Sequence, residues 1–402
     1  MVRLFPQKVS TASIANVDSL CQALSIPRSV LDQVLALGLD ERYKEVMHIK
    51  KADGTNRPIY NPHHLLRRIQ KKINERIFSD TKIIKWPGFL YGSIPNQTGS
   101  SGQDVSKDYV ACAAVHCGAK SLLKIDVESF FDNIQRDIVL NIFSKFLKYP
   151  EDVADVLTNI CCYKGRLVQG ALTSSYIASL CLWDVEGNVV RRLNLKGLRY
   201  TRLVDDITVS SVGLATDFSY AKKLVEDMLS DRDLPIKASK TKVYRMSSEP
   251  LTVHSLRVNF SSPRLPADEV GRIRAAVKHV ERLASEPNYI TTHSYRKVYN
   301  RCVGRVNKLS RVGHNQHKIL LARLNKIKPL PSFSDIRRAK AMLARLKSDF
   351  GSKGHTHWYR SRYYRLDQRL RILSRRYERT SDQIREEIRG IKPFKKHSSE
   401  TH

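Results

Sequence analysis

Two adjacent aspartates, Asp205 and Asp206, interrupt an apolar run of the sequence, Leu203-Val-Asp-Asp-Ile-Thr-Val209. A buried carboxylate is costly unless it is paired or bound to a metal. Neighbouring residues of a strand also point to opposite faces of a sheet, so one straight strand cannot present both carboxylates to the same site. A tight hairpin with both aspartates at its tip satisfies these constraints. On these residues alone, an ordinary surface turn is the simpler interpretation.

A third carboxylate, Asp126, ends a second short apolar run, Ser121-Leu-Leu-Lys-Ile-Asp126. If the two strands are neighbours in one sheet, Asp126 and Asp205 come together at their ends. Such a cluster can hold two Mg²⁺ ions about 3.5–4 Å apart, one activating a 3′-hydroxyl and one stabilising pyrophosphate. Mg²⁺ binds few carboxylates together with waters and substrate phosphates, which fits this ligand set. Taken alone, Asp126 is equally consistent with a helix N-cap or a turn.

The charge of the chain points to a polyanionic partner. Its 402 residues include 70 Lys and Arg against 39 Asp and Glu, a formal net charge of +31. From Arg301 onward there are 27 basic and 8 acidic residues, so this last quarter contributes 19 of the 31 charges. Nucleic acid is the commonest partner of such a surface. A merely soluble basic surface is the alternative, but solubility does not require so large an excess of one sign.

The composition indicates a globular, intracellular protein. The hydrophobic share is 41%, no run of about 18 apolar residues is present to span a membrane, and the first residues lack the layout of a signal peptide. We therefore expect a cytoplasmic protein with no membrane partner. The seven cysteines lie mostly among apolar neighbours, which favours buried thiols over disulfides. Cys112, His116 and Cys117 lack a second pair at ligand spacing, which argues against a zinc site.

The periodicity of the apolar residues predicts an α+β chain. Extended runs from Glu45 to Tyr60 flank an Asp-Gly turn and predict a basic β-hairpin. The stretch from Ser174 to Leu193 predicts one helix, and Thr252 to Val258 predicts one short strand. An amphipathic helix is expected from Ala267 to Ser285, and the helical pattern continues to a basic, aromatic stretch from Trp358 to Ile391.

The order and spacing of several motifs resemble those of reverse transcriptases, most closely the bacterial retron type. The segments that match the polymerase motifs of this family are Ile125–Phe131, Gln169-Gly170, Val204-Asp205-Asp206 and Lys240-Thr-Lys242. Arg57-Pro-Ile-Tyr-Asn-Pro62 resembles the fingers of retron-type enzymes, and the resemblance as a whole covers about residues 20–260. It implies a right-hand polymerase fold. The expected parts are the N-terminal helices and fingers (1–120), the palm with the catalytic aspartates (121–260), a helical thumb (261–350) and a basic aromatic helical extension (351–402).

The resemblance implies RNA-directed DNA synthesis and gives the residues around the aspartates specific roles. Asp126 and Asp205, with Val127 beside them, would bind two Mg²⁺ ions, for which Mn²⁺ could substitute. Asp206 would help to place the primer end. Lys240 would protonate the leaving pyrophosphate as a general acid, a role that requires only local reach and a suitable pKa.

The resemblance also implies a binding site for the incoming deoxynucleotide. Phe131 would crowd a ribose 2′-hydroxyl, although a core position for this ring is the alternative. Gln169 and Gly170 would abut the nucleotide and the template base. Arg57 and Lys51 would grip the triphosphate, because a guanidinium pairs with phosphate through two hydrogen bonds. Without the resemblance, these two residues are simply solvated charges of a hairpin.

The basic helical end predicts nucleic-acid binding. Arg272 and Lys278 lie on the helix from Ala267 to Ser285, where a thumb would hold the phosphates of the template–primer duplex. Further along, aromatic and basic residues alternate, and stacking on unpaired bases would suit structured RNA. The residues of this second group are Trp358, Arg360, Arg362, Tyr363 and Arg365. The alternative is that these aromatic residues form one face of a long helix and pack in a protein core.

Three departures from the family pattern are present, of which the first and the last argue against a standard retron enzyme and the first two motivate a non-catalytic alternative. Leu203-Val204 replaces the usual Tyr-Ala, Leu172 and Ser175 stand where prolines are typical, and Val253-His254-Ser255 replaces a Val-Thr-Gly segment. We therefore expect a retron-like reverse transcriptase of anti-phage defence that copies its own non-coding RNA template into DNA from dNTPs. The alternatives are a catalytically weak RNA-binding scaffold and a template-independent or protein-primed DNA polymerase. The sequence leaves open whether the protein forms an oligomer and whether it acts with an effector protein.

Overall fold

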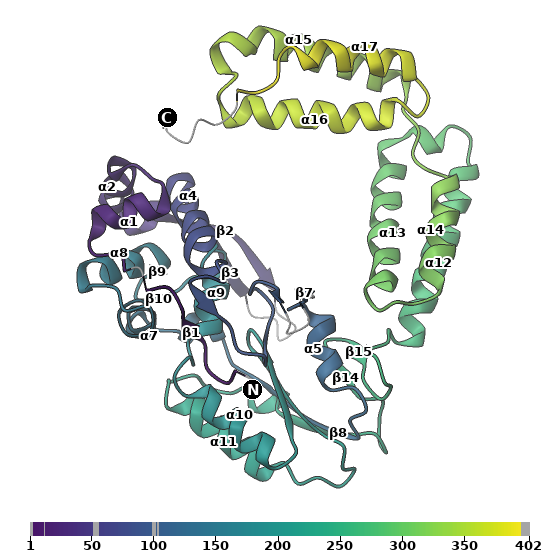
Figure 1. Ribbon diagram of the computed structural model, residues 1–402. Helices are drawn as coiled ribbons and strands as arrows, with labels where there is room; N and C mark the ends of the chain where they lie inside the picture. The colour runs from purple at the N-terminus through teal and green to yellow at the C-terminus, as the bar shows by residue number, and fades with distance from the viewer. Residues whose placement is uncertain (1–2, 12, 51–55, 99–101, 103, 395–402) are drawn as a thin grey trace. The chain divides into compact units, whose positions relative to one another are not determined.

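The computed structural model describes residues 3–11, 13–50, 56–98, 102 and 104–394. The chain divides into two compact units, Met1–Arg264 and Leu265–His402. The first unit mixes strands and helices, whereas the described part of the second is helical (Figure 1). Among the described residues, no helix is long and apolar enough to cross a membrane.

The centre of the first unit is a five-stranded sheet in the order β13-β8-β12-β11-β5. Neighbouring strands are antiparallel, except that β11 and β5 are parallel. The apolar run of β8, the second strand in this order, is buried along most of its length. The five strands are β5 (Leu90–Tyr91), β8 (Ser121–Asp126), β11 (Arg199–Leu203), β12 (Asp206–Ser211) and β13 (Lys242–Arg245).

Helices cover both faces of this sheet. The alternation of side chains along β11 shows this, because Tyr200 bonds to Glu186 of α10, whereas the next residue, Thr201, contacts His116 at the end of α5. The sheet can therefore be apolar on both sides. The helices around it are α5 (Tyr109–Val115), α9 (Ser174–Leu180), α10 (Glu186–Leu195) and α11 (Ser219–Ser230).

The N-terminal part adds helices and a long hairpin. The hairpin predicted from Glu45 to Tyr60 is confirmed as β2 (Tyr43–Lys50) and β3 (Asn56–Pro62), whereas Lys51 lies outside the described residues. The other helices are α1 (Val17–Leu24), α2 (Arg28–Ala36), α3 (Leu39–Arg42), α4 (His64–Ile73), α6 (Phe130–Asn133), α7 (Arg136–Asn141), α8 (Glu151–Cys161) and π-helical turns at Asn74–Phe78 and Ile142–Phe146. Short ladders join β1 (Gln7–Lys8) to β4 (Ile84–Lys85), β6 (Gln97–Thr98) to β7 (Asp104–Val105) and β9 (Cys162–Tyr163) to β10 (Arg166–Leu167).

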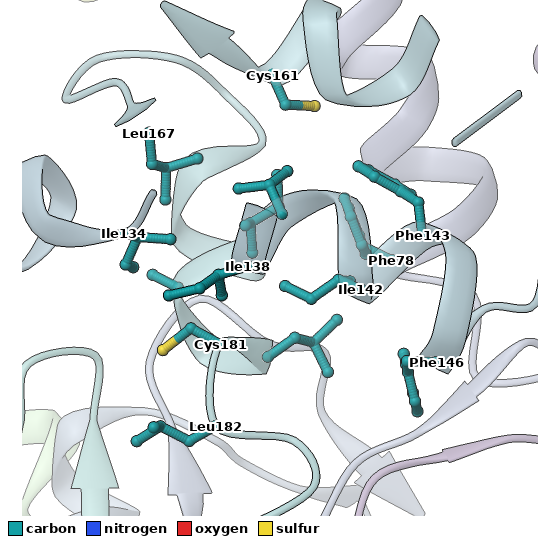
Figure 2. Packing of buried hydrophobic residues seen from close by; sticks show 14 of the residues in the cluster. Phe78, Ile134, Ile138, Ile142, Phe143, Phe146, Cys161, Leu167, Cys181 and Leu182 are labelled. Carbon is teal, nitrogen blue, oxygen red and sulfur yellow. The ribbon is translucent and has the colours of Figure 1, made fainter. Parts of the chain in front are cut away.

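One hydrophobic core joins these helices to the sheet. Figure 2 shows part of this core, where Phe78 and Phe143 lie among aliphatic side chains. All seven cysteines are free and six of them are buried, as predicted for thiols with apolar neighbours. Burial raises the pKa of Cys161 and Cys181 to about 12, so both thiols keep their protons.

The single helix predicted from Ser174 to Leu193 is wrong. α9 ends at Leu180, and α10 begins at Glu186 after a short turn. We attribute the break between the two helices to a contact with a residue outside the segment. The carboxylate of Glu186, at the start of α10, pairs with the guanidinium of Arg202 in the interior of the unit, with an Nε–Oε1 distance of 2.6 Å.

The single strand predicted from Thr252 to Val258 is also wrong. The segment is a short hairpin of β14 (Thr252–Val253) and β15 (Leu256–Arg257). The two residues between the strands, His254 and Ser255, have φ values of 47° and 64°. Backbone in this left-handed region reverses the chain, and neither residue type is a usual signal for such a turn.

The second unit consists of two clusters of helices, each with its own core. The first cluster comprises α12 (Ala267–Ser285), a 3-10 turn (Tyr289–Thr291), α13 (His293–Arg311) and α14 (Gln316–Lys326). The second comprises α15 (Phe333–Lys353), α16 (His357–Leu373) and α17 (Glu378–Arg389). The stretch from Trp358 to Ile391 is thus two helices that cover each other's apolar residues. Buried side chains divide the unit between α14 and α15, whereas the sequence placed a boundary at residue 350.

Candidate active site at the end of the central sheet

The three aspartates of the predicted site meet at one end of the central sheet. β12 pairs with β8 so that Asp206 lies opposite Asp126, and β11 pairs with β12 so that Leu203 lies opposite Asp206. The two residues between these strands, Val204 and Asp205, form the turn. The predicted hairpin tip is therefore present, and Asp126 lies beside it on a neighbouring strand.

The turn itself has a strained backbone. Val204 has φ 60°, a left-handed conformation that costs a side-chain-bearing residue roughly 1–2 kcal/mol and is least suited to a β-branched one. The surroundings hold it in place. Arg202 Nη1 donates to the carbonyl of Val204 at 3.1 Å, and a Cβ added to Gly92, which has φ 105°, would lie 3.2 Å from Val204 Cγ2. Contacts from two sides thus fix the residue next to Asp205.

A buried ion pair supports the strand that leads into this turn. Arg202 and Glu186 are 1% and 3% exposed and form two hydrogen bonds, of 2.6 and 2.7 Å. The guanidinium also donates to the carbonyls of Ala178 and Ser179 in α9, and Tyr200 Oη donates to Glu186 at 2.8 Å. Burial lowers the pKa of Arg202, but Glu186 outweighs this and raises it, so the guanidinium stays charged. No pattern in the local sequence predicted this ion pair. Only the resemblance of the chain to the family covers the strand that carries Arg202.

Lys240 lies within reach of the aspartates, as predicted. It ends a 3-10 turn (Ala238–Lys240), and its Nζ donates to Asp126 Oδ2 at 2.9 Å. This hydrogen bond raises the pKa of Lys240 above its ordinary value, so the ammonium keeps its proton. The side chain of Val127, next to Asp126, is apolar and buried at 3% exposure, so the main-chain carbonyl is the one group of this residue that could be a metal ligand. Among the described residues, no three His, Cys, Asp or Glu side chains are arranged to hold a metal ion.

Asp206 has a histidine neighbour that sequence reasoning did not assign to the site. His254 Nδ1 lies 3.6 Å from Asp206 Oδ2. This contact is the main cause of a lowered pKa at the Asp206 carboxyl, against burial, which raises it. Both residues line a cleft of about 390 Å³ that also contains Asp126 and the cations Lys124 and Lys242. The cleft therefore combines carboxylates that suit a divalent cation with ammonium groups that suit phosphates.

Gly170 is required where the chain passes the hairpin of β2 and β3. Its φ is 112°, and an added Cβ would lie 2.1 Å from the carbonyl oxygen of Tyr60. The amide of Tyr60 donates to the carbonyl of Gln169 at 3.1 Å. Arg57 lies in the same strand, β3. The structure thus joins the Gln169-Gly170 motif to the predicted fingers segment, which the sequence could suggest only through the family.

The two phenylalanines after Asp126 have different surroundings. Phe130 is 3% exposed and belongs to the core, whereas Phe131 is only partly buried and packs at the edge of that core. Their ring centroids lie 6.0 Å apart. The core position that the sequence left open is thus that of Phe130, and the role of Phe131 as a sugar gate stays a prediction.

The predicted nucleic-acid residues of the second unit divide into exposed and structural ones. Arg272 and Lys278 are exposed on α12, and Trp358 and Arg365 are exposed on α16. Tyr363 is corrected: it is 8% exposed and packs in the core of α15–α17, because that face of α16 must be covered. Besides Trp358, this segment exposes the ring of Tyr364, at 56%.

Two predicted arginines of this segment contact the protein itself. Arg360 donates to the carbonyl of Phe394 at 3.0 Å, and Arg362 pairs with Asp349 at 2.6 Å. Both pairs tie α16 to its neighbours. Part of the basic character of the segment is therefore used within the cluster.

Known proteins match this chain over most of its length. Residues 49–269 match the family described as reverse transcriptase (RNA-dependent DNA polymerase). Retron Ec48 reverse transcriptase of Escherichia coli is 46% identical over 93% of this chain and 91% of that protein. Retron Se72 reverse transcriptase of Salmonella heidelberg is 33% identical over 82% of this chain and 84% of that protein. Retron Ec86 reverse transcriptase of Escherichia coli is 26% identical over 66% of this chain and 78% of that protein.

The family match and the sheet with its three aspartates define most of the first unit as a reverse transcriptase domain. The chain as a whole belongs to the bacterial retron-type reverse transcriptases, which are RNA-directed DNA polymerases. Enzymes of this family use divalent metal ions. Because retron enzymes are among its relatives, the replacement of Val-Thr-Gly by Val253-His254-Ser255 does not separate the chain from the retron enzymes. The expectation that this replacement argues against a retron enzyme is corrected.

Proposed function

We propose that Asp126 and Asp205 bind two Mg²⁺ ions, with Mn²⁺ as a substitute, for the transfer of a deoxynucleotide to a primer. The observation that carries this proposal is the strand register that sets Asp206 opposite Asp126, with Asp205 in the adjoining turn. Carboxylate oxygens are the protein ligands that Mg²⁺ prefers beside water and phosphate. Bound there, the ions would activate the primer 3′-hydroxyl and stabilise the leaving pyrophosphate.

The chain's own residues supply the remaining parts of this proposal. Lys240 donates a proton to the pyrophosphate, a role that its position beside Asp126 supports. Asp206 places the primer end. Lys124 and Lys242 add positive charge to the cleft and attract phosphates. The main-chain carbonyl of Val127 is offered as a further metal ligand.

The proposed nucleotide site lies between the sheet and the hairpin of β2 and β3. Gln169 and Gly170 abut the incoming nucleotide and the template base, and Phe131 excludes a ribose 2′-hydroxyl. Arg57 and Lys51 grip the triphosphate. The close approach of Gly170 to β3 supports the first part of this assignment.

The metal role is tested by primer extension on an RNA template over a range of Mg²⁺ concentrations. Asp126→Asn should lower the rate by a factor on the order of 10² or more at every concentration, because the ligand charge is lost. Asp152→Asn, at an exposed position of α8, is the matched control and should behave like wild type. Extension by Asp126→Asn at the wild-type rate would refute the metal role.

We also propose that the template is a cognate non-coding RNA held by the second unit. The retron enzymes among the relatives, the net charge of +31 and the exposure of Trp358 (76%) beside Arg365 support this assignment. Arg272 and Lys278 would hold the template–primer duplex through its phosphates. Sequencing of RNA that co-purifies with wild type and with the pair Trp358→Ala and Arg365→Ala provides the test. One enriched RNA that the variant loses is expected, and equal recovery of total cellular RNA by both proteins would contradict it.

The biological setting that we propose is bacterial anti-phage defence, which the retron type implies. Phage should form fewer plaques on cells that carry the gene than on cells that carry the Asp205→Ala and Asp206→Ala variant. Equal numbers of plaques across a broad phage panel would contradict a defence role, without affecting the polymerase assignment. An effector protein that acts with the enzyme would be found among the partners that co-purify from these cells.

A further inference from the structure

The hairpin of β14 and β15 presents a second strained turn beside the aspartates. His254 and Ser255 both have left-handed backbones, and a turn with two such residues ordinarily contains Asn-Gly. This conformation is unfavourable for residues other than glycine. Strain of this kind persists only where the surrounding structure enforces it, and it is common at functional sites.

The strained turn places the His254 ring between two polar groups. Nδ1 lies 3.6 Å from Asp206 Oδ2, and Nε2 lies 3.3 Å from Cys112 Sγ on α5. The side chain is only 12% exposed and lines the same cleft as Asp126. The ring therefore has one edge toward the aspartates and one edge toward the protein interior.

A buried polar network lies behind the ring and fixes that inner edge. Cys112 Sγ is 3.3 Å from Thr201 Oγ1, which is 2.7 Å from His116 Nε2, and His116 Nδ1 is 2.7 Å from Ser210 Oγ. Burial lowers the pKa of His116 to about 3, so this ring is neutral. All four residues are almost fully buried. They connect His254 to the two central strands, β11 and β12, that carry Asp205 and Asp206 at their ends.

The carboxylate of Asp206 determines which nitrogen of His254 must carry a proton for their contact to be favourable. An ionised carboxylate can only accept a hydrogen bond, so Nδ1 must be protonated for its contact with Asp206 to be attractive. Burial raises the pKa of the Cys112 thiol to about 12, so the thiol keeps its proton, which it donates to Thr201 Oγ1. The inner edge of the ring therefore packs against a neutral, buried thiol, 3.3 Å from Nε2.

The other cations near Asp206 have partners of their own. Lys240 Nζ bonds to Asp126, and Lys124 Nζ lies over the ring of Tyr244 at 5.0 Å from its centroid. Neither lysine is held by a network comparable to that behind His254. A rigid contact to Asp206 therefore comes from the imidazole and not from a flexible lysine.

We propose that His254 is a positioning residue for polymerisation: it fixes the orientation of the Asp206 carboxylate and thereby the position of the primer end. The inference deepens the proposed function, because it rests on the role of Asp206 in placing the primer. His254 does not touch the reacting atoms. Its loss acts through the binding and placement of the primer–template, not through the bond-forming step itself.

Two conservative substitutions separate this role from a merely structural one. In His254→Asn the amide nitrogen takes the place of Nδ1, and Asn tolerates the left-handed turn. In His254→Gln the amide reaches the place of Nε2, toward Cys112, and the contact with Asp206 is lost. Ser255→Gly relieves strain in the same turn without touching the ring, and serves as the control for turn geometry.

The experiment is steady-state primer extension by the full chain on an RNA template, with KM for primer–template, KM for dNTP and kcat measured separately. His254→Gln should raise KM for primer–template roughly tenfold, in the range expected when a close polar contact with a charged group is lost. KM for dNTP should change little. His254→Asn should recover most of this loss, and Ser255→Gly should match wild type. Thermal unfolding of each variant shows that it is folded.

Two outcomes would overturn the inference: wild-type kinetics for His254→Gln, or equal impairment of His254→Gln and His254→Asn. Asp206→Asn, measured in the same assay, separates this failure from failure of the proposed function. If Asp206→Asn extends primers like wild type, the proposed role of Asp206 fails. If Asp206→Asn is impaired and His254→Gln is not, only the inference about His254 fails.

Discussion

The ion pair behind the aspartates of the first unit and the typical ion pairs of the second unit differ in their burial. In the first unit, Arg202 and Glu186 are almost fully buried and bonded to each other and to main-chain carbonyls. In the second, a typical pair such as Lys347 and Glu387 leaves 51% and 44% of its side chains exposed. A buried pair fixes its atoms but is costly to break, whereas an exposed pair contributes little to stability. The first unit thus maintains a fixed geometry around the aspartates, and the second presents charge to a partner.

Backbone strain follows the same division. Val204, His254 and Ser255 are left-handed residues with full side chains, and all three lie at the end of the sheet that carries the aspartates. In the described part of the second unit, the left-handed non-glycine residue is Asn288, a type that tolerates this conformation. Eight of the nine left-handed non-glycine residues in the described part of the chain thus lie in the unit that holds the aspartates, and three of these eight lie at the end of its sheet. Binding of a phosphate backbone does not require such strain.

The largest effect on stability is expected from breaking the buried pair. Arg202→Met leaves Glu186 buried without its partner and should lower the free energy of unfolding by about 3–5 kcal/mol. Lys347→Met removes one partner of the exposed pair and should change it by less than about 1 kcal/mol. Urea denaturation of the full chain measures both. Similar losses for the two variants would remove the contrast between the units.

Two adjacent tyrosines test the division within the second unit itself. Tyr363→Ala removes a core ring and should destabilise the protein by about 3 kcal/mol. Tyr364→Ala should leave stability nearly unchanged but weaken RNA binding, because stacking on one base is worth about 1–3 kcal/mol. Denaturation and RNA filter binding measure the two properties. The account is contradicted if Tyr364→Ala destabilises the protein more than Tyr363→Ala does.

One ion pair of the second unit is an exception to its surface character and gives a pH dependence. Asp335 of α15 pairs with Arg296 of α13, at 12% and 17% exposure. Burial raises the pKa of Asp335, but Arg296 and Ser332 outweigh it and lower it from 3.8 to about 2. Because the folded pKa lies below the unfolded one, the stabilisation is complete above about pH 4 and is lost as the pH falls toward 2.

Asp335→Asn should abolish this pH dependence and lower the free energy of unfolding at neutral pH by about 2 kcal/mol. Denaturation curves between pH 2 and 7, for wild type and variant, provide the measurement. The difference between the two proteins should shrink as the pH falls. A difference that stays constant over this range would show that the ionised carboxylate is not the cause.

The smallest effect is expected from relief of the strained turn. Val204→Gly removes a left-handed β-branched residue and should raise the free energy of unfolding by about 0.5 kcal/mol, after the entropy that glycine loses on folding. Ser25→Gly, at the left-handed end of α1, should give a similar gain. Activity separates the two variants, because only Val204 adjoins the aspartates. If Val204→Gly and Ser25→Gly change the rate of DNA synthesis equally, a special role for the strained turn is contradicted.

The sequence predicted the parts of the site that local patterns determine. The apolar runs placed Asp126 at the end of one strand, with Asp205 and Asp206 at the tip of a hairpin beside it. The register of β8 with β12 sets Asp206, rather than Asp205, opposite Asp126. The position of Lys240 came from the family motif, and the structure brings it to Asp126. These features depend on side chains close together in sequence or on a motif as a whole.

The parts that the sequence did not predict depend on distant partners. The break before Glu186 follows from its pairing with Arg202, and the turn at His254 uses residues that rarely occupy left-handed positions. The burial of Tyr363 rather than Tyr364 follows from the packing of α16 on α15 and α17. None of these features has a signal within its own segment.

The central claim is that the three aspartates at the end of the sheet carry out RNA-templated DNA synthesis. Incorporation of labelled dNTPs on an RNA template, by wild type and by Asp205→Ala with Asp206→Ala, tests it most directly. Asp382→Ala, on the exposed surface of α17, is the control for removal of an acidic residue. We predict wild-type incorporation by the control and a loss on the order of 10³-fold or more by the double variant. Equal incorporation by the double variant and wild type would contradict the account.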